Sequence, residues 1–336
     1  MLVAPALLIV TAWMAATPAA ASPAWSTASA TPPPSRWVAV SVATLWVEPR
    51  QERRVDAPAV ANPADPRGWV AGMTTAQKRW LVGRLETQAL YGTRVYLLKT
   101  SGSWSKVAVK GQPTPRNRWG YPGWLPSAQL TDVVPAMTPQ KAPRMAIVRR
   151  RTAWLREASD LSRRVLELSY GTRLPAVAWT PTFVEVVTLD GRHLYVRRSA
   201  VALHAPGTPW PVLTGAKLVA QAQKFRGLQF LYGGTSGFGF DCSGFTHTVY
   251  KALGRTIPRD AAPQYARGKK IVSRSALRRG DLVFFRNSSS GIHHVGMYAG
   301  SGKMIHSPGT GQAVRLTSIY TAHYFSEFAG GRRHTP

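Results

Sequence analysis

A short phrase occurs twice in the first two thirds of the chain, and this internal repeat constrains the fold more than any other feature. Tyr91-Gly92-Thr93-Arg94-Val95 recurs as Tyr170-Gly171-Thr172-Arg173-Leu174. Each copy leads to two apolar runs of strand length, which are residues 104–109 and 121–125 for the first and 183–189 and 193–196 for the second. Short β-rich runs joined by glycine turns are typical of small barrels. The repeat therefore predicts two small β modules in tandem.

The first predicted module contains a long insertion, from about Arg50 to Leu85. The insertion is proline-rich at its start, and Thr74 then precedes a run to Val82 that is typical of a capped helix. An insertion of this size on a small barrel often has a function of its own. The alternative is that both modules only attach the protein to a surface.

After Trp210 the pattern changes to mixed helix and strand, which predicts an α+β domain. Thr214 is placed to cap a helix that runs to about Phe225. A glycine-rich turn over residues 232–237 leads to Asp241-Cys242-Ser243-Gly244-Phe245, and apolar residues then recur at helical spacing until Gly254. Cys242 therefore falls in the first turn of a predicted helix.

Cys242 is the only cysteine, so the chain has no internal disulfide framework. A lone thiol is either buried and inert or retained for its chemistry. A free thiol has a pKa of about 8.5, and helix N-terminal N–H groups and a nearby cationic histidine favour the thiolate that attacks a carbonyl. The same N–H groups can bind the oxyanion that forms. We expect Cys242 to be a nucleophile, with Asp241 either capping the helix or contacting substrate.

Histidines downstream supply a candidate base. In a strand that starts at His294, residues His294, Gly296 and Tyr298 share one face. A hairpin that turns at residues 300–302 brings His306 within hydrogen-bonding reach of His294, as the third member of a triad requires. His293 is expected to be a solvated neighbour. Zinc binding by Cys242, His294 and His306 is disfavoured because no fourth ligand accompanies them, so neither metal nor cofactor is expected.

The charge and the N-terminus indicate where the chain acts. Lys and Arg number 43 against 15 Asp and Glu, a net charge of +28, which predicts an anionic partner: nucleic acid, anionic membrane or cell-wall polymer. An apolar run from Val3 to Ala16, followed by small residues at 19–21, is typical of a secretory signal, with an uncleaved anchor as the alternative. No later run is long enough for a stable membrane span. Export, and the lack of a nucleic-acid-binding motif, favour anionic cell-wall polymers over nucleic acid.

Four separated motifs occur in the order typical of one family. They are Tyr232-Gly233-Gly234, Asp241 to Phe245, Gly280 to Phe285, and His294-Val295-Gly296-Met297-Tyr298. Together they resemble the NlpC-type family of papain-like cell-wall peptidases, from about Thr214 to Phe328. The repeated Gly-Thr-Arg step and Gly123 to Pro126 are similar to bacterial SH3-like domains. The whole chain resembles the SH3-like-domain-containing γ-D-glutamyl-L-diamino acid endopeptidases. The implied domains are a signal peptide (1–21), a Pro/Ser/Ala-rich linker (22–35), a first SH3-like module with the insertion (36–140), a second module (141–207) and the catalytic domain (210–336).

This resemblance implies a secreted cysteine peptidase of the cell wall or cell envelope. It would cut the bond between γ-D-glutamate and the diamino acid, diaminopimelate or Lys, in peptidoglycan stem peptides, and would prefer a free N-terminal L-Ala. Cys242 would be the nucleophile, His294 the base and His306 the orienting residue. The implied substrate contacts are Glu86, Tyr121, Tyr232, Asp241 and Ser243.

One position departs from the pattern, because Ala261 stands after Pro258-Arg259-Asp260 where relatives often have serine. Arg259 and Asp260 are the candidates to replace that contact. Two alternatives stay open: a catalytically inactive wall-binding protein, and an amidase or transacylase on the same scaffold.

Overall fold

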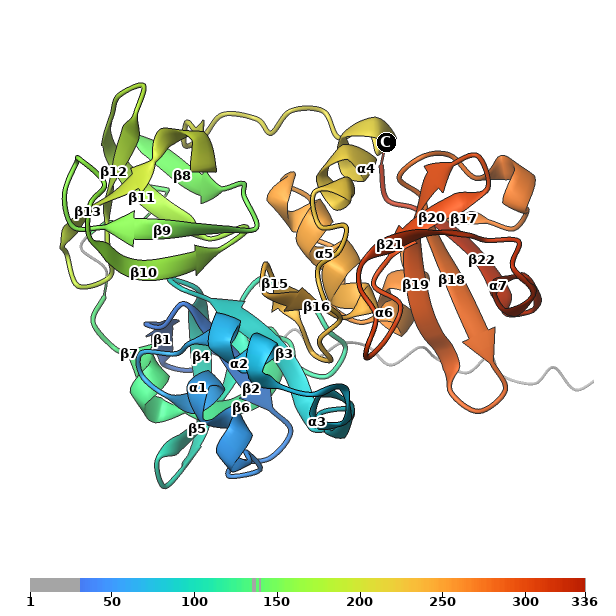
Figure 1. The fold of residues 1–336 in the computed structure, drawn as a ribbon, viewed down its shortest axis with the longest axis horizontal. Helices are drawn as coiled ribbons and strands as arrows, with labels where there is room; N and C mark the ends of the chain where they lie inside the picture. The colour runs from blue at the N-terminus through green and yellow to red at the C-terminus, as the bar shows by residue number, and fades with distance from the viewer. Residues whose placement is uncertain (1–30, 135–136, 139, 336) are drawn as a thin grey trace, which may run out of the picture. The chain divides into compact units, whose positions relative to one another are not determined.

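The computed structural model describes residues 31–134, 137–138 and 140–335 (Figure 1). The predicted signal peptide and most of the predicted linker lie outside these residues. The chain from Pro33 onward forms one compact unit. None of the described helices has both the length and the apolar character needed to cross a membrane.

The first module is a seven-stranded antiparallel sheet. Its strands are β1 (Ser35–Val38), β2 (Val42–Trp46), β3 (Leu85–Leu90), β4 (Arg94–Ser101), β5 (Trp104–Val109), β6 (Tyr121–Pro126) and β7 (Leu130–Thr131). They are ordered β3-β2-β6-β5-β4-β1-β7. Alternating residues such as Val107, Val109 and Leu125 are fully buried, because one face of each strand closes over the core.

The insertion of the first module lies between β2 and β3. It contains a short 3-10 helix (Arg54–Asp56) and the helices α1 (Ala57–Val60), α2 (Pro66–Gly72) and α3 (Thr75–Trp80). Thr74 caps α3 as predicted, with Gln77 completing a capping box. The insertion packs Trp69 and Leu81 into one apolar cluster with Trp46 of the barrel and Leu231 of the C-terminal domain. It therefore ties the start of β3 to the chain just before Tyr232.

The second module repeats the topology of the first. Its strands are β8 (Arg144–Val148), β9 (Thr152–Arg156), β10 (Arg164–Ser169), β11 (Arg173–Trp179), β12 (Phe183–Val187), β13 (His193–Arg197) and β14 (Val201–His204). Their order, β10-β9-β13-β12-β11-β8-β14, is that of the first sheet strand for strand. The sequence repeat thus corresponds to two sheets with one topology, and each repeated phrase forms the turn that enters β4 or β11.

The C-terminal domain sets helices beside an antiparallel sheet. Helix α4 (Gly215–Gln223) is followed by the short strands β15 (Thr235–Ser236) and β16 (Gly239–Phe240), then by α5 (Cys242–Ala252) and α6 (Ala261–Tyr265). The sheet comprises β17 (Lys269–Ile271), β18 (Leu282–Asn287), β19 (Gly291–Gly300), β20 (Lys303–His306), β21 (Arg315–Ser318) and β22 (Phe328–Arg333), with α7 (Ala322–Ser326) before the last strand. The strand order is β17-β22-β18-β19-β20-β21.

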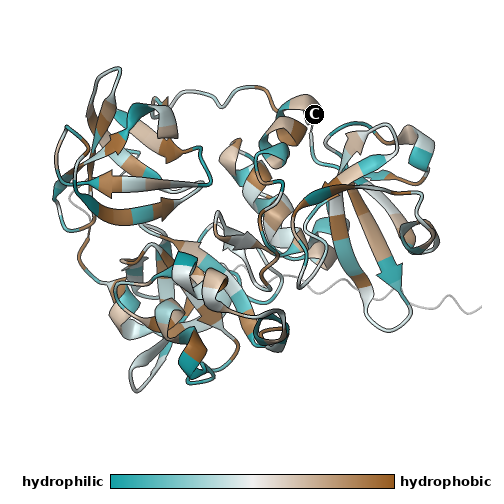
Figure 2. Cartoon of the chain, viewed as in Figure 1, coloured by the Kyte–Doolittle hydropathy of each residue, from teal (hydrophilic) through white to brown (hydrophobic). Residues whose placement is uncertain are grey.

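Apolar residues recur along the central strands of this sheet, as the brown segments show (Figure 2), and they form two separate clusters. Phe284, Val295 and Met297 pack with α4 and α5 in the main core. Val283 and Phe285 belong to a second cluster. Because successive residues of a strand face opposite sides, the two clusters hold β18 and β19 in a fixed register. That register places His294 and His306.

Candidate active site

Helix α5 begins at Cys242, as the sequence predicts, and Asp241 is its N-cap. The Asp241 carboxylate accepts a hydrogen bond of 2.6 Å from the backbone N–H of Gly244. A side chain is excluded at Gly244, since a Cβ atom there would lie 2.1 Å from the carbonyl oxygen of Gly234. The Asp-Cys-Ser-Gly sequence therefore presents Cys242 at a helix start that is packed tightly against the glycine-rich turn.

Two histidines form a hydrogen-bonded relay on neighbouring strands. Nε2 of His294, on β19, lies 2.8 Å from Nδ1 of His306, at the end of β20. The Nε2 atom of His306 in turn lies 2.9 Å from the hydroxyl of Thr317 on β21. The hairpin predicted at residues 300–302 forms. Since Nε2 of His294 is occupied, Nδ1 is its nitrogen that remains for another partner.

His293 is bound rather than solvated. Its Nε2 lies 2.9 Å from a Glu327 carboxylate oxygen, and its side chain is only 26% exposed. The expectation of a solvated neighbour was wrong because the end of α7 brings Glu327 against His293 on β19.

Burial favours the neutral forms of the Cys242 thiol and the His294 imidazole. The pKa of Cys242 is raised to about 12, chiefly by burial and then by the charge of Asp241, while hydrogen bonds from the backbone of Val295 and Ser243 act in the opposite direction. Burial also lowers the pKa of His294 well below 6.5, with the neighbouring His306, His293 and His323 adding to the effect. Desolvation and the charge of Asp241 thus oppose the thiolate, whereas the backbone hydrogen bonds favour it.

Cys242 and His294 line one cavity of about 470 Å³. Tyr232, Asp241, Ser243 and Asp260 line it too, as do Glu86 and Tyr121 from the first module. No residue of the second module is among the described residues that line this cavity. Apart from His306, which is fully buried behind His294, the structure brings every predicted site residue to this cavity.

Gly233 allows the first module to approach closely. It has a positive φ of +72°, and a Cβ atom there would lie 2.9 Å from Cβ of Leu85. A larger residue would push β3 away from the glycine-rich turn. The Thr235 hydroxyl also donates a hydrogen bond of 2.9 Å to the backbone carbonyl of Gln88 on β3. These contacts hold Glu86 at the edge of the catalytic domain.

Glu86 is not free in this cavity, because Arg116 pairs with it. An Arg116 guanidinium nitrogen lies 2.7 Å from a Glu86 oxygen, and the same arginine donates to the Tyr121 hydroxyl at 3.3 Å. The Arg116 side chain is 47% exposed and that of Glu86 is 10% exposed. The Tyr121 hydroxyl donates to Asp260 at 3.1 Å. Sequence reasoning missed Arg116, which lies in a β5–β6 loop without a repeating pattern.

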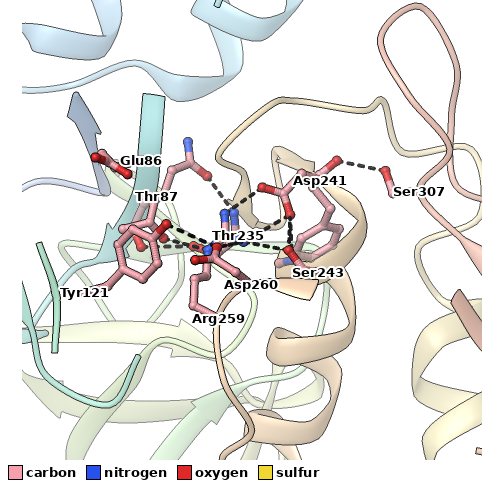
Figure 3. Close-up of polar contacts among 12 residues, drawn as sticks. Glu86, Thr87, Tyr121, Thr235, Asp241, Ser243, Arg259, Asp260 and Ser307 are labelled. Carbon is pink, nitrogen blue, oxygen red and sulfur yellow. Dashed lines mark hydrogen bonds and ion pairs between the residues drawn. The ribbon is translucent and has the colours of Figure 1, made fainter. Parts of the chain in front are cut away.

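Arg259 supports the site from a buried position. Its guanidinium pairs with Asp241 at 2.6 Å and donates to the hydroxyls of Ser243 at 3.1 Å and Thr87 at 2.9 Å (Figure 3). The Arg259 side chain is 1% exposed. Arg259 was a candidate to replace the missing serine as a substrate contact, but its guanidinium already binds Asp241, Ser243 and Thr87. It fixes Asp241 and Ser243 and joins them to the first module.

Aromatic side chains whose role at the site the sequence did not indicate pack against the histidine relay. Tyr324 of α7 stacks on His294 with ring centroids 5.9 Å apart, and Phe285 lies at the same distance. These rings exclude water from the imidazole, which explains its lowered pKa. Phe285 ends the motif from Gly280 to Phe285, whereas Tyr324 belongs to none of the four motifs, and the contact of either ring with His294 is seen only in the folded domain.

Comparisons with known proteins agree with this geometry. Residues 227–333 match the NlpC/P60 family and residues 148–204 match the YKFC SH3b2 domain. A gamma-D-glutamyl-L-lysine dipeptidyl-peptidase of Bacillus cereus is 40% identical over 304 residues, which cover 89% of this chain and 91% of the relative. The chain belongs to the NlpC/P60 family of cysteine peptidases. A protein of the same name from Bacillus subtilis is 34% identical, covering 87% of this chain and 96% of the relative.

A solved structure shows the same architecture over nearly the whole length. The crystal structure of an NlpC/P60 family protein from Bacillus cereus superposes with a TM-score of 0.84 at 39% identity, and the match covers 90% of this chain and 100% of that one. The predicted fold class, a papain-like NlpC-type domain preceded by SH3-like modules, is confirmed by these matches and by the two repeated sheets.

Proposed function

We propose that this NlpC/P60 peptidase is a secreted enzyme that cuts the bond between γ-D-glutamate and a diamino acid in peptidoglycan stem peptides carrying a free N-terminal L-Ala. The observation that carries the proposal is a cavity that combines Cys242 and His294 with carboxylates from two domains. The two Bacillus relatives named gamma-D-glutamyl-L-lysine dipeptidyl-peptidase support the choice of bond.

Cys242 is the nucleophile and His294 the general base. With both groups neutral at rest, the thiol proton moves to Nδ1 of His294 as sulfur attacks the γ-carbonyl carbon. Nδ1 must therefore be unprotonated, so that Nε2–H of His294 donates to Nδ1 of His306, and Nε2–H of His306 donates to the Thr317 hydroxyl. His306 and Thr317 thus act as positioning residues that select one tautomer.

Hydrolysis then follows in two stages, acylation and deacylation. The tetrahedral oxyanion meets N–H groups at the start of α5, with Tyr232 beside it, and collapses as the C–N bond breaks. His294 passes the thiol proton to the departing amine of the diamino acid. Water, deprotonated by His294, attacks the thioester, and the glutamyl carboxylate leaves as Cys242 regains its proton.

The charge balance of the cavity favours one cationic group on the substrate. Its described lining residues include three carboxylates, those of Glu86, Asp241 and Asp260, against the guanidiniums of Arg116 and Arg259. Asp241 is held by the buried Arg259, whereas the partner of Glu86 is exposed. An N-terminal ammonium can displace Arg116 from Glu86 and bind there beside Tyr121 and Asp260. We expect Ser243 to contact the D-glutamate carboxylate.

The site of action follows from the N-terminus and the charge. Residues 1–21 have the pattern of a secretory signal, and the net charge of +28 favours a wall that carries anionic polymers. Such polymers would concentrate the enzyme near its substrate.

Digestion of defined stem peptides tests the proposal. Peptides with a free L-Ala amine and the same peptides acetylated at that amine are incubated with the protein, and products are identified by mass spectrometry. We expect cleavage after γ-D-glutamate, faster for the free amine. Cys242→Ala should lower kcat by about a thousandfold or more while leaving the thermal midpoint unchanged.

Retained turnover in Cys242→Ala would contradict the assignment of the nucleophile. Products cut at another bond would instead identify an amidase or a transacylase. Equal rates for free and acetylated peptides would leave the peptidase in place but remove the proposed recognition of the amine.

A further inference from the structure

A second cavity lies away from the catalytic one, where both β modules meet the C-terminal domain. Its volume is about 630 Å³. Four cationic residues line it: Arg94, Lys110, Arg173 and Lys251. The described lining residues include no aspartate or glutamate. A cavity of this size can hold a small organic molecule. Because it shares no lining residue with the catalytic cavity, the proposed reaction does not account for it.

These cations lack counterions. In the described part of the chain, no ion pair involves any of the four. Lys251 extends from the last turn of α5 toward the first module, with its Nζ 3.5 Å from where a Cβ atom of Gly111 would stand. Burial, followed by the charge of Arg173, lowers the pKa of Lys251 to about 8. A bound anion would relieve both effects.

Two buried polar side chains on this cavity also lack partners. Nε2 of His247 and the hydroxyl of Thr172 form no hydrogen bond, although each residue is 1% exposed. Nδ1 of His247 lies 2.8 Å from the carbonyl oxygen of Ile257 and so carries the proton. Burial lowers the pKa of His247 to about 3, which keeps the ring neutral. Nε2 is therefore a buried acceptor without a hydrogen-bond partner among the described residues.

We propose that this cavity binds a phosphorylated polyol. The phosphate would lie among Lys251, Arg173 and Lys110, since guanidinium and ammonium groups together suit a group with several anionic oxygens. A hydroxyl of the polyol would donate to Nε2 of His247 while the phosphate oxygens accept from the cations. Glycerol phosphate has both groups, either as a free molecule or as a unit of a polymer.

Isothermal titration of the full chain tests this proposal, with sn-glycerol 3-phosphate, poly(glycerol phosphate), inorganic phosphate and glycerol as separate probes in buffers of matched ionic strength. We expect saturable binding of a glycerol phosphate probe that exceeds binding of inorganic phosphate and of glycerol. Binding of the monomer identifies a free small molecule as the ligand, and binding of the polymer alone identifies the polymer. Absence of saturable binding by both overturns the proposal.

Variants locate the binding. Lys251→Gln should raise the dissociation constant by about tenfold or more, and Lys110→Gln, at an exposed position, should raise it without affecting folding. Lys99→Gln removes the same charge from an exposed position outside the cavity and should have no effect. Unchanged binding in both Lys251→Gln and Lys110→Gln overturns the proposal. Cys242→Ala should bind like the wild type, so failure of the catalytic assignment does not affect this test.

Discussion

The two β modules have the same strand order but different relations to the catalytic cavity. The first module contributes Glu86, Arg116 and Tyr121 to that cavity. None of the described residues that line the cavity comes from the second module. The second module meets the C-terminal domain elsewhere: its Arg151 donates to the backbone carbonyls of Lys224 at 2.9 Å and Arg226 at 2.6 Å. One barrel topology thus contributes residues to the catalytic cavity in the first module and contacts the C-terminal domain outside that cavity in the second.

The difference arises from local additions rather than from the sheets. The helical insertion of the first module packs against Leu231, and Gly233 allows β3 to approach the glycine-rich turn. The second module has a short connection between β9 and β10 at the equivalent place. A duplicated barrel can therefore acquire a new role through one loop while its core is preserved.

The largest effect on stability is expected where the first module meets the catalytic helix. Arg259→Ala would leave Asp241 buried and unpaired and would remove the bond to Thr87, so we expect a loss of about 3–5 kcal/mol in the free energy of unfolding. Chemical denaturation measures this value. Arg151→Ala, which removes an exposed arginine that bridges the second module to the same domain, should cost less than about 1.5 kcal/mol. Equal losses would show that both modules are supports of the same kind.

A matched pair of glutamates tests whether only the first module recognises substrate. Glu86 and Glu167 each pair with an exposed arginine, and their side chains are 10% and 9% exposed, but only Glu86 lines the catalytic cavity. Glu86→Gln should reduce kcat/KM for peptides with a free N-terminus by roughly tenfold to a hundredfold, because a charged hydrogen bond is lost. Acetylated peptides should be unaffected. The control Glu167→Gln should leave selectivity unchanged, and a loss of selectivity there would reject the comparison.

Removal of Arg116 should have a smaller effect in the opposite direction. Arg116→Gln frees Glu86 from an ion pair whose cationic partner is 47% exposed, and such pairs contribute about 0–1 kcal/mol. We expect KM for free-amine peptides to fall by up to about fivefold with little change in kcat. Steady-state kinetics on the same peptides measure both constants. A rise in KM would instead show that Arg116 binds the substrate itself.

The sequence predicted the local parts of the site and missed the parts that depend on packing. The helix start at Cys242 and the hairpin that joins His294 to His306 follow from caps, periodicity and glycine turns over short stretches. The ion pair of Arg259 with Asp241 and that of Arg116 with Glu86 join residues from separate elements, and no short-range pattern specifies them. The raised pKa of Cys242 depends on burial, which the helix start does not reveal.

The smallest expected effect concerns pH, and neither β module should influence it. Burial is the main cause of the lowered pKa of His294. The charged groups that add to it are His306, His293 and His323, all in the C-terminal domain. A lowered pKa means that His294 stays neutral, and able to accept the thiol proton, as the pH falls below 6.5. The acidic limb of kcat/KM for a free-amine peptide should therefore lie below pH 6.5 and should be unchanged in Glu86→Gln, although that variant has a lower plateau. A limb at or above pH 6.5 would contradict the dry environment of the base, and a limb that moves in Glu86→Gln would show that the first module sets ionisation as well as affinity.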